Sequence, residues 1–448
     1  MTAPTLASPN VETVRVAGRW KRIGVGVVAV ILLAVLERYA FSEGWRLQRQ
    51  NSAIKLGAGP FVGSWELRLS AKILPAVAIA VTAVIWLPTV VRRLRSTRAA
   101  LATAAVSALF AVALAASDGW HAIIAPVVHP TEYWQGTRAG GSVVDYLSSF
   151  LKRQGGSSVH VRGHPPGFSM MLLLLRSVGL GSAWFAAAIS FAGVAMGVTA
   201  IGCTVRRLAG REAFVRSLPF LALAPYAIWQ GTSADAFFSG LASVGIGLLV
   251  LAMTSTRRWV ERTSAVVGGL VIGTCCLLTF ATPTLIPLVA AVTWKTRRVR
   301  WIPLALVGTA LVVGLFAVGG YWWLDGLTNT RKFYAAGTAK FRPTFYFFFA
   351  NLAVLAIAVG PAAVAGLVRF RSTARTISVI VVGVLGCVLL ADGSGLSKAE
   401  TERIWLLYMP WISVAAAGVA TTVGRQRWWL GSQATAAIVL QVALVSKW

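Results

Sequence analysis

Acidic residues are the scarcest charged class in this chain. Asp and Glu together number 14 in 448 residues, against 42 Lys and Arg, and charged residues make up only 12% of the sequence. Soluble proteins carry about 25% charged residues, so a water-soluble globular fold of this length is excluded. The hydrophobic fraction of 57% and the mean hydropathy of +0.72 support the same exclusion.

Cysteine and histidine are also rare, with four of each. The cysteines fall inside apolar runs, and their spacing matches neither a disulfide framework nor a zinc motif. We therefore expect them to pack between helices. They are Cys203, Cys275, Cys276 and Cys387.

Apolar runs of roughly 17–23 residues are abundant, and each is long enough to cross a bilayer as a helix. We predict an all-α fold, a polytopic transmembrane helical bundle of about thirteen spans. The run after Lys21 and Arg22 is too long for a signal-peptide core, so we expect a retained first helix. The expected spans are 22–41, 71–91, 99–117, 182–204, 213–230, 235–255, 264–281, 283–296, 302–323, 346–367, 376–391, 404–422 and 429–446.

The net charge of +28 raises the question of nucleic-acid binding. The basic residues, however, form short clusters between apolar runs, and no basic soluble domain exists to bind DNA or RNA. Short loops rich in Lys and Arg mark the cytoplasmic side of a membrane, where anionic headgroups attract them. We expect membrane lipids as partners and no nucleic acid. The clusters are 92–98, 206–211, 256–262, 295–300, 369–375 and 425–427.

Residues 166–179 are apolar but too few for an ordinary crossing. Counting them as a span would also move later basic loops to the outer side. We expect a juxtamembrane helix there, begun by Pro165 and Pro166, since proline suits a first helical turn. The predicted organisation is a disordered cytoplasmic segment 1–19, two additional spans within 20–98, and a module 99–255 with an outer loop 118–165. C-terminal helices follow within 256–448, with outer loops 325–345 and 392–403.

The outer loop 118–165 gathers the polar chemistry, including all four histidines. Asp118 and Glu132 lie there near histidine and arginine, where a carboxylate could act as a general base or simply be solvated. For Asp145, on a short amphipathic stretch, solvation is the favoured interpretation. The histidines fit no zinc spacing, so hydrogen bonds to a phosphate or sugar are the expected role of His129, His160 and His164. A divalent cation such as Mg²⁺ or Mn²⁺ on Asp118, Glu132 or Asp235 stays open.

Two further segments extend this chemistry. Asp235 opens a span, where an acid either caps the helix or faces the same cavity as the outer loop. Arg403 precedes another span beside Glu402, and its guanidinium suits either a phosphate oxygen or a local salt bridge. Lys332 and Arg342 lie among aromatic residues at an interface, where basic side chains commonly reach lipid phosphate.

Four motifs in order resemble those of the glycosyltransferase C superfamily of polyprenyl-phosphate-sugar-dependent membrane enzymes, which includes protein mannosyltransferases and aminoarabinose transferases. They are "TEY" (131–133), where the family often has Asp-Glu-Tyr, "GHPPGF" (163–168), "VRRLAG" (205–210) and "SADAFF" (233–238). The resemblance covers roughly 99–255, and the C-terminal half is similar only in layout. Thr131 stands where the family's first acid would be.

The resemblance implies an inverting glycosyltransferase that moves a sugar from a polyprenyl phosphate. Glu132 is the preferred base, with Asp118 as the other choice, and Asp235 is the third acid. Basic groups would neutralise the departing phosphate. The implied substrate-binding residues are His129, Tyr133, His160, Arg162, His164, Lys332, Arg342, Glu402 and Arg403.

The alternatives are a transporter or flippase of lipid-linked saccharides and a structural membrane protein. Transport sites commonly appear as intramembrane charges or broken helices, whereas the apolar runs here have few ionisable residues at their centres. The composition is typical of a bacterium of high GC content. We therefore expect a multi-pass protein of the bacterial plasma membrane, with its active site facing outward and an envelope glycan, lipid or protein as acceptor.

Overall fold

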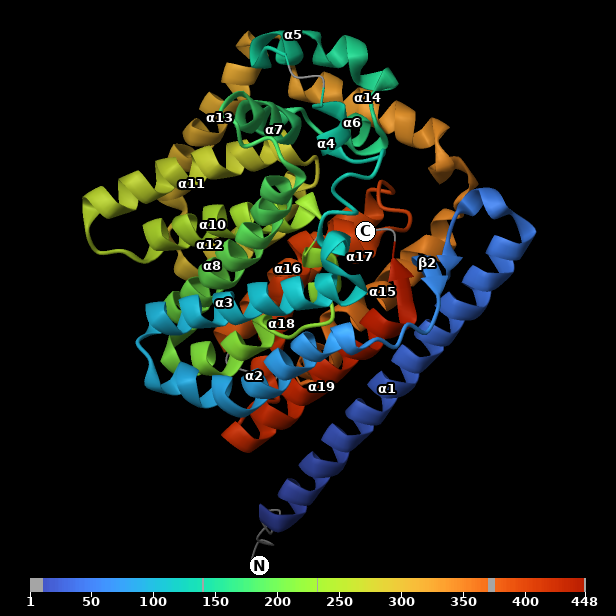
Figure 1. Ribbon diagram of the computed structural model, residues 1–448. Coiled ribbons are helices and arrows are strands. Elements are labelled where there is room, and N and C mark those ends of the chain that lie inside the picture. Colours follow the sequence, from blue (N-terminus) through green and yellow to red (C-terminus); the bar gives the residue numbers. More distant parts are fainter. Residues whose placement is uncertain (1–10, 139–140, 232, 370–374, 447–448) are drawn as a thin grey trace, which may run out of the picture.

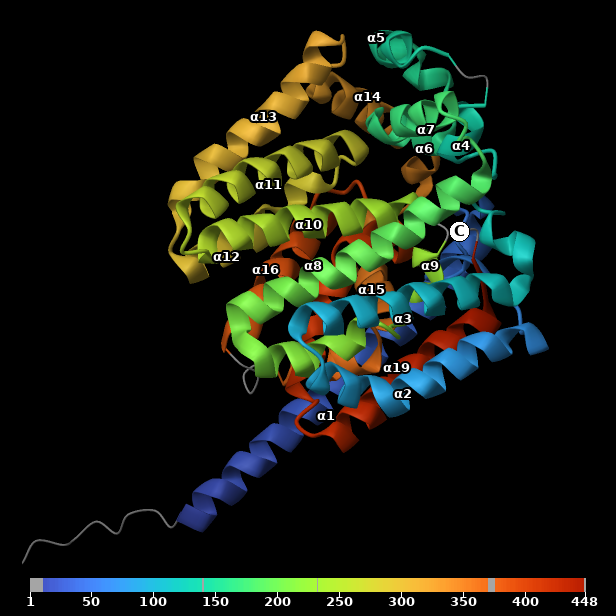
Figure 2. The ribbon, with the colours of Figure 1, turned by 60° about the vertical axis from the view of Figure 1, so that its left-hand side comes forward.

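The computed structural model describes residues 11–138, 141–231, 233–369 and 375–446, which are almost entirely helical (Figures 1 and 2). Eight helices are long and apolar enough to cross a membrane. The protein is therefore a polytopic helical membrane protein, as predicted. These eight are α2 (Leu74–Arg93), α3 (Ser96–Ala115), α8 (Ala183–Ser217), α10 (Ala234–Thr254), α11 (Arg258–Leu278), α13 (Ile302–Val318), α15 (Thr344–Val368) and α16 (Arg375–Gly393). Two further long helices are α1 (Val11–Gln50) and α19 (Val423–Ala443).

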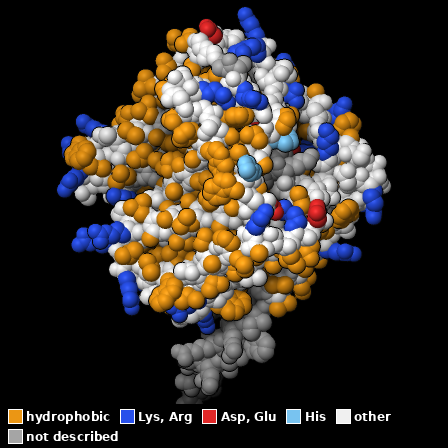
Figure 3. Space-filling model, in the orientation of Figure 1, with side chains coloured by type: hydrophobic (Ala, Val, Ile, Leu, Met, Phe, Trp, Pro, Cys, Tyr) orange, Lys and Arg blue, Asp and Glu red, His pale blue; other side chains and the backbone are white. Residues whose placement is uncertain are grey.

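Helices α2, α3, α8, α10, α11 and α13 form a row in which each packs against the next. Small residues allow the closest approaches: Gly193 of α8 faces Gly240 of α10, and Gly269 of α11 faces Ala305 of α13. Such contacts are typical of membrane helices, since lipid supplies no hydrophobic force between them. The face of the molecule that Figure 3 shows is mostly apolar, with Lys and Arg mainly at its edges and few acidic or histidine side chains.

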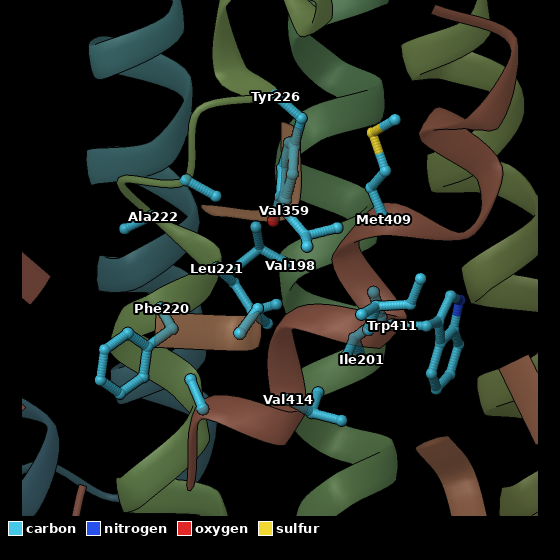
Figure 4. Close-up of a cluster of buried hydrophobic side chains, with 14 of the residues drawn as sticks. Val198, Ile201, Phe220, Leu221, Ala222, Tyr226, Val359, Met409, Trp411 and Val414 are labelled. Atoms are coloured by element: carbon cyan, nitrogen blue, oxygen red, sulfur yellow. The ribbon is translucent and has the colours of Figure 1, made fainter. Parts of the chain in front are cut away.

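Two expected spans are not continuous helices. Over 213–230, α8 ends at Ser217 and is followed by a 3-10 turn and the short α9 (Ala227–Gln230). Over 404–422 the chain is divided among α17 (Thr401–Ile404), α18 (Met409–Ser413) and 3-10 turns. The expectation of regular helices there is wrong. Both broken segments pack in the buried centre between α8 and α15, where apolar side chains meet (Figure 4).

Side chains and neighbouring backbone satisfy the polar groups that these breaks release. Ser107 donates to the carbonyl of Leu221 at 3.1 Å, and Ser239 donates to the carbonyl of Leu406 at 2.7 Å. The amide of Tyr226 donates to Ala358 of α15 at 2.9 Å. Irregular backbone is tolerated at membrane depth only where the protein supplies such partners.

Two glycines mark the sharpest bends. Gly210, at the end of the "VRRLAG" motif, has φ 85° and separates two helices within α8, so the predicted turn exists. Arg211 then donates to the carbonyls of Val91, Arg92 and Leu94, which closes the end of α2. Gly360 has φ 80° in α15, and the amide group of Gln433 bridges that break.

The segment between α3 and α8 folds into short helices that lie in the upper part of Figure 1. They are α4 (Tyr133–Gly136), α5 (Val143–Arg153), α6 (Val159–Gly163) and α7 (Gly167–Ser177). Helix α5 coincides with the predicted amphipathic stretch, and α7 lies within the predicted juxtamembrane segment. Nearby lies α14 (Trp323–Ala336), while α12 (Ile286–Thr296) lies between α11 and α13 in sequence.

A small antiparallel sheet was not expected from the sequence. The strands β1 (Gly57–Ala58), β2 (Phe61–Trp65) and β3 (Leu444–Ser446) pair in that order. Gly63 lies opposite Ser446. The sheet therefore joins the segment after α1 to the end of the described chain.

The α8–α10 contact gives a test of the packing. Replacing Gly240 by Ala places a methyl group against the backbone of Gly193, whereas the same change at Gly247 meets its nearest neighbour at 3.4 Å. Both changes gain about 1 kcal/mol of helix propensity, but overpacking at 240 costs about 1–3 kcal/mol. We expect the melting temperature in detergent to fall for Gly240→Ala and to hold or rise for Gly247→Ala. Equal melting temperatures would contradict the packing described.

Candidate functional site

Asp235 lies at the start of α10, as the sequence indicated, and it serves both as a helix-start acid and as an ion-pair partner. Ser233 is the N-cap: its hydroxyl accepts from the amide of Asp235 at 3.1 Å and donates to Asp235 Oδ2 at 2.8 Å. The same Oδ2 receives Arg403 Nη1 at 2.5 Å. Ser233, and not Asp235, is therefore the cap of α10, while Asp235 adds an acid to its first turn and pairs with Arg403.

Arg403 is the centre of the cluster, although it comes from a segment 168 residues further along the chain. Its side chain is 3% exposed and extends from α17 toward α6. Besides Asp235, its second terminal nitrogen lies 3.3 Å from His160 Nδ1 and 3.4 Å from Glu400 Oε2. A buried guanidinium needs this many acceptors, because a charge without partners is costly away from water.

The contact with Arg403 fixes the tautomer of His160. A guanidinium has only donors, so Nδ1 of His160 must be the lone-pair nitrogen. The ring proton then lies on Nε2, which donates to Glu132 Oε1 at 3.2 Å. Burial and the charge of Arg403 hold the pKa of His160 well below 6.5. His160 is therefore a neutral bridge from Arg403 to Glu132.

Glu132 ends this chain of contacts, immediately before α4. Two hydrogen bonds hold its backbone: the Glu132 amide donates to the carbonyl of His129, and the Ser158 hydroxyl donates to the carbonyl of Glu132. Burial raises its pKa from 4.5 to about 7, an effect that the charge of Arg403 opposes. The side chain keeps 15% of its surface exposed. A carboxyl group that exchanges a proton near neutral pH and still reaches solvent can act as a general base.

Aromatic rings form the wall behind Glu132. The ring of Tyr133 lies 5.0 Å from that of Phe168 and 5.6 Å from that of His164. His164 Nδ1 hydrogen-bonds the carbonyl of His160 at 2.9 Å, and burial lowers the pKa of His164 below 6.5. The Pro165-Pro166 pair therefore begins α7 directly beside the acidic motif.

A cavity of about 20 Å³ adjoins Glu132 and Tyr133. It has room for about one water molecule. The hydroxyl of Tyr133 has no hydrogen-bond partner among the described residues.

Glu400 also belongs to the cluster, although it was not among the predicted site residues. Its Oε1 lies 3.6 Å from Arg342 Nη1, and its Oε2 contacts Arg403. Ala399 and Glu400 have φ of 68° and 64°, a costly conformation for residues with side chains. Arg342 holds this bend by donating to the carbonyls of Lys398 and Ile54. The three-residue spacing between Glu400 and Arg403 was the available signal.

The structure brings together six of the predicted residues: Glu132, Tyr133, His160, His164, Asp235 and Arg403. Arg342 joins them through Glu400. His129 lies at the exposed margin and hydrogen-bonds Thr131 at 2.7 Å.

Four predicted residues lie elsewhere. Asp118 pairs with Arg68 at 2.5 Å and receives Gln441, so its contacts are with the segments near the sheet. Arg162 donates to Gly155 and lies over the ring of Phe333. Lys332 is exposed on α14. Glu402 is buried on the far side of α17, where its Oε1 accepts from the amide of Val62 at 3.4 Å.

The described residues contain no group of three or more His, Cys, Asp or Glu side chains placed to hold a metal ion. Two carboxylates of the cluster are already engaged. Asp235 binds Arg403, and Glu132 binds His160. A divalent cation at this place would have to displace one of these partners.

No protein-family model matches the chain, and no curated protein matches it. Among solved structures, ArnT from Cupriavidus metallidurans in the apo state is 14% identical with a TM-score of 0.41, and the same protein bound to undecaprenyl phosphate is 12% identical with a TM-score of 0.42. An oligosaccharyltransferase from Archaeoglobus fulgidus, in complex with Zn and sulfate, is 12% identical with a TM-score of 0.38.

These likenesses cover 68% of this chain for both ArnT structures and 77% for the oligosaccharyltransferase. The chain spans 60% of the length of ArnT and 53% of that of the oligosaccharyltransferase. With TM-scores below 0.5, they assign no residue role to this protein.

The raised pKa of Glu132 predicts how stability depends on pH. The folded protein binds this proton more tightly than the unfolded chain, so stability falls as pH rises from about 4.5 to about 7 and stays reduced above it. Glu132→Gln removes the burial of a charge. We expect a small difference in melting temperature from wild type at pH 5 and a more stable variant at pH 8, by up to about 3 kcal/mol.

The control for that measurement is Glu212→Gln, since Glu212 is an exposed carboxylate of α8 paired with Arg216. It should show no growing stabilisation between pH 5 and pH 8. A Glu132→Gln variant that parallels this control would refute a buried, proton-exchanging Glu132.

Proposed function

We propose that this protein is an integral membrane glycosyltransferase. It moves a sugar from a polyprenyl-phosphate donor to an envelope glycan, lipid or protein at the outer face of the bacterial plasma membrane. The transfer inverts the anomeric centre, and Glu132 is the general base that accepts the proton of the acceptor hydroxyl. A hexose and a pentose both suit this scheme.

The observation that carries the proposal is the contact chain Glu132–His160–Arg403–Asp235. It joins a carboxyl group whose pKa is about 7 to a buried guanidinium across one neutral imidazole. General bases are most effective when their pKa lies near the working pH. These contacts lie at the N-terminal end of α10, beside the short helices α4 and α6. In this proposal, a membrane-anchored donor presents its phosphate there.

The leaving phosphate is assigned to Arg403, with His164 beside it. Arg403 Nη2 lies 3.4 Å from Glu400 Oε2, a longer contact than the 2.5 Å between Arg403 Nη1 and Asp235 Oδ2. A phosphate oxygen can therefore take the place of Glu400 while the Asp235 pair stays intact. Fixed positive charge at a developing anion is a large catalytic term in a site with little water. Arg342, buried beside Glu400, and Arg162 and Lys332, outside the cluster, remain proposed contacts of the donor.

Transport of lipid-linked saccharides is the second candidate function, and the broken segments 213–230 and 404–422 are the observation that favours it. These segments are lined by apolar side chains such as Leu221 and Met409 (Figure 4). The charged cluster lies at their end near α17 and not at their middle. That distribution supports chemistry at the membrane surface over passage through the centre.

Membranes containing the protein should consume a polyprenyl-phosphate sugar, and Glu132→Gln should reduce the rate at least about 100-fold, the usual contribution of a general base. Asp118→Asn should reduce it far less, because Asp118 pairs with Arg68 away from the cluster. The wild-type rate should rise with pH through about 7 as Glu132 loses its proton. Size-exclusion profiles of both variants control for folding.

A rate that depends on Asp118 and not on Glu132 would reverse the assignment. A protein that moves a fluorescent lipid-linked saccharide across vesicles, without forming any product and with Glu132→Gln fully active, would favour the transporter instead.

The role left open for Mg²⁺ or Mn²⁺ gives a separate test. Because Arg403 already supplies the positive charge beside Asp235, we propose that transfer needs no divalent cation. The rate in membranes washed with EDTA should equal the untreated rate. Loss of activity that only Mg²⁺ or Mn²⁺ restores would show that a cation displaces Arg403 or His160 from its carboxylate.

A further inference from the structure

A large apolar groove lies on the flank of the helix row, at the end opposite the charged cluster. Its volume is about 650 Å³, and helices α12 and α13 form its sides, with Leu249 of α10 and Ile272 of α11 at its floor. Trp294 and Leu306 on its walls are more than half exposed. Exposed apolar walls of this kind on a membrane-spanning bundle face lipid.

The groove has the depth of one membrane leaflet. It runs along α12 from Ile286 to Arg297, about 16 Å at 1.5 Å per residue. Half of the hydrocarbon core of a bilayer is about 15 Å. An acyl chain anchored at the Arg297 end would therefore fill the groove to its inner end.

Arg297 supplies positive charge at the mouth. Its neighbours Arg298 and Arg300 both pair with the buried Glu261, at 3.1 and 3.4 Å. Among the described residues no carboxylate pairs with Arg297, which lines the groove and is exposed. Arg297 also has φ 54°, so the backbone holds it in a turn at the end of α12, where its amide donates to Thr293.

The mouth lies at the end of α10 opposite Asp235. Helix α10 has 21 residues and is about 30 Å long, so its two ends reach the two leaflets. The basic runs 256–262 and 295–300 flank the groove end of this helix. The groove therefore opens in the leaflet away from the cluster.

We propose that this groove is a binding site for one anionic glycerophospholipid of the bilayer, with its phosphate on Arg297 and an acyl chain between α12 and α13. The site is separate from the cluster around Arg403 and does not depend on the proposed function. Its depth, its apolar walls and the unpaired cation at its mouth match the two parts of such a lipid.

Native mass spectrometry of the full-length protein in detergent tests the site, with phosphatidylglycerol and phosphatidylcholine of the same acyl chains as probes. Wild type should retain one phosphatidylglycerol about fivefold more strongly than phosphatidylcholine, the effect of one basic residue on an anionic lipid. Arg297→Gly should remove this preference, because glycine keeps the turn at positive φ without the charge. Ala290→Trp, which fills the groove, should reduce retention of both lipids.

The matched control is Arg425→Gln, since Arg425 is an exposed arginine of another basic run and its guanidinium donates to Thr421. It should keep the wild-type preference. Equal retention of the two lipids by wild type, or an unchanged preference in Arg297→Gly, would overturn the proposal. Retention of both lipids by Ala290→Trp would place the lipid outside the groove, and stronger retention of a polyprenyl phosphate than of phosphatidylglycerol would assign the groove to a different lipid.

Discussion

One buried guanidinium connects parts of the chain that are far apart in sequence. Arg403 contacts Asp235 of α10, His160 of α6 and Glu400 of its own segment. Removing one partner of a buried ion pair typically costs about 3–5 kcal/mol, because the remaining charge is left without compensation. Without Arg403, the carboxylates of Asp235 and Glu400 would face each other in a site with little water. This side chain therefore helps to hold α6 and α10 beside α17, together with contacts such as the hydrogen bond from Ser239 to Leu406.

The bend before Arg403 is part of the same constraint. Ala399 and Glu400 hold positive φ, and that strain persists because Arg342 and the ion pairs of Arg403 fix the chain on both sides. Strained backbone of this kind is found where surrounding contacts over-determine it, commonly at functional sites. Helix α17 begins directly after this bend but ends at Ile404, and further short pieces follow in place of the expected span 404–422.

Hydropathy predicted the long helices because length and apolar character are the properties that a bilayer selects. It could not predict the breaks at 213–230 and 404–422, since a buried broken segment is as apolar as a regular one. Their partners, such as Ser107 for Leu221 and Ser239 for Leu406, come from other helices and are visible only in the fold. Helix α5 was predictable because its amphipathic pattern is local.

The candidate site was predictable in part for a similar reason. The order of short motifs brought Glu132, His164 and Asp235 into consideration, and Arg403 stood out as a charge at the start of an apolar run. Asp118 and Glu402 had equally good sequence contexts, yet one pairs with Arg68 and the other faces Val62. Which of two nearby acids faces the cluster depends on a turn of the backbone that composition does not specify. Glu400 was not among the predicted site residues, although its spacing of three from Arg403 allowed the salt bridge that the structure shows.

In the proposed reaction, the contact chain also links the departure of the phosphate to the basicity of Glu132. Arg403 opposes the rise in the pKa of Glu132 that burial causes. The phosphodiester of the donor carries one negative charge, as does the Glu400 carboxylate that it displaces. The phosphate gains a second negative charge as its bond to the sugar breaks, and added negative charge raises the pKa of a nearby carboxyl group. Glu132 thus becomes a stronger base as the phosphate departs, while His160 keeps its Nε2 proton on the side of Glu132. The proton that Glu132 takes from the acceptor then balances the charge of the departing phosphate across the same four residues.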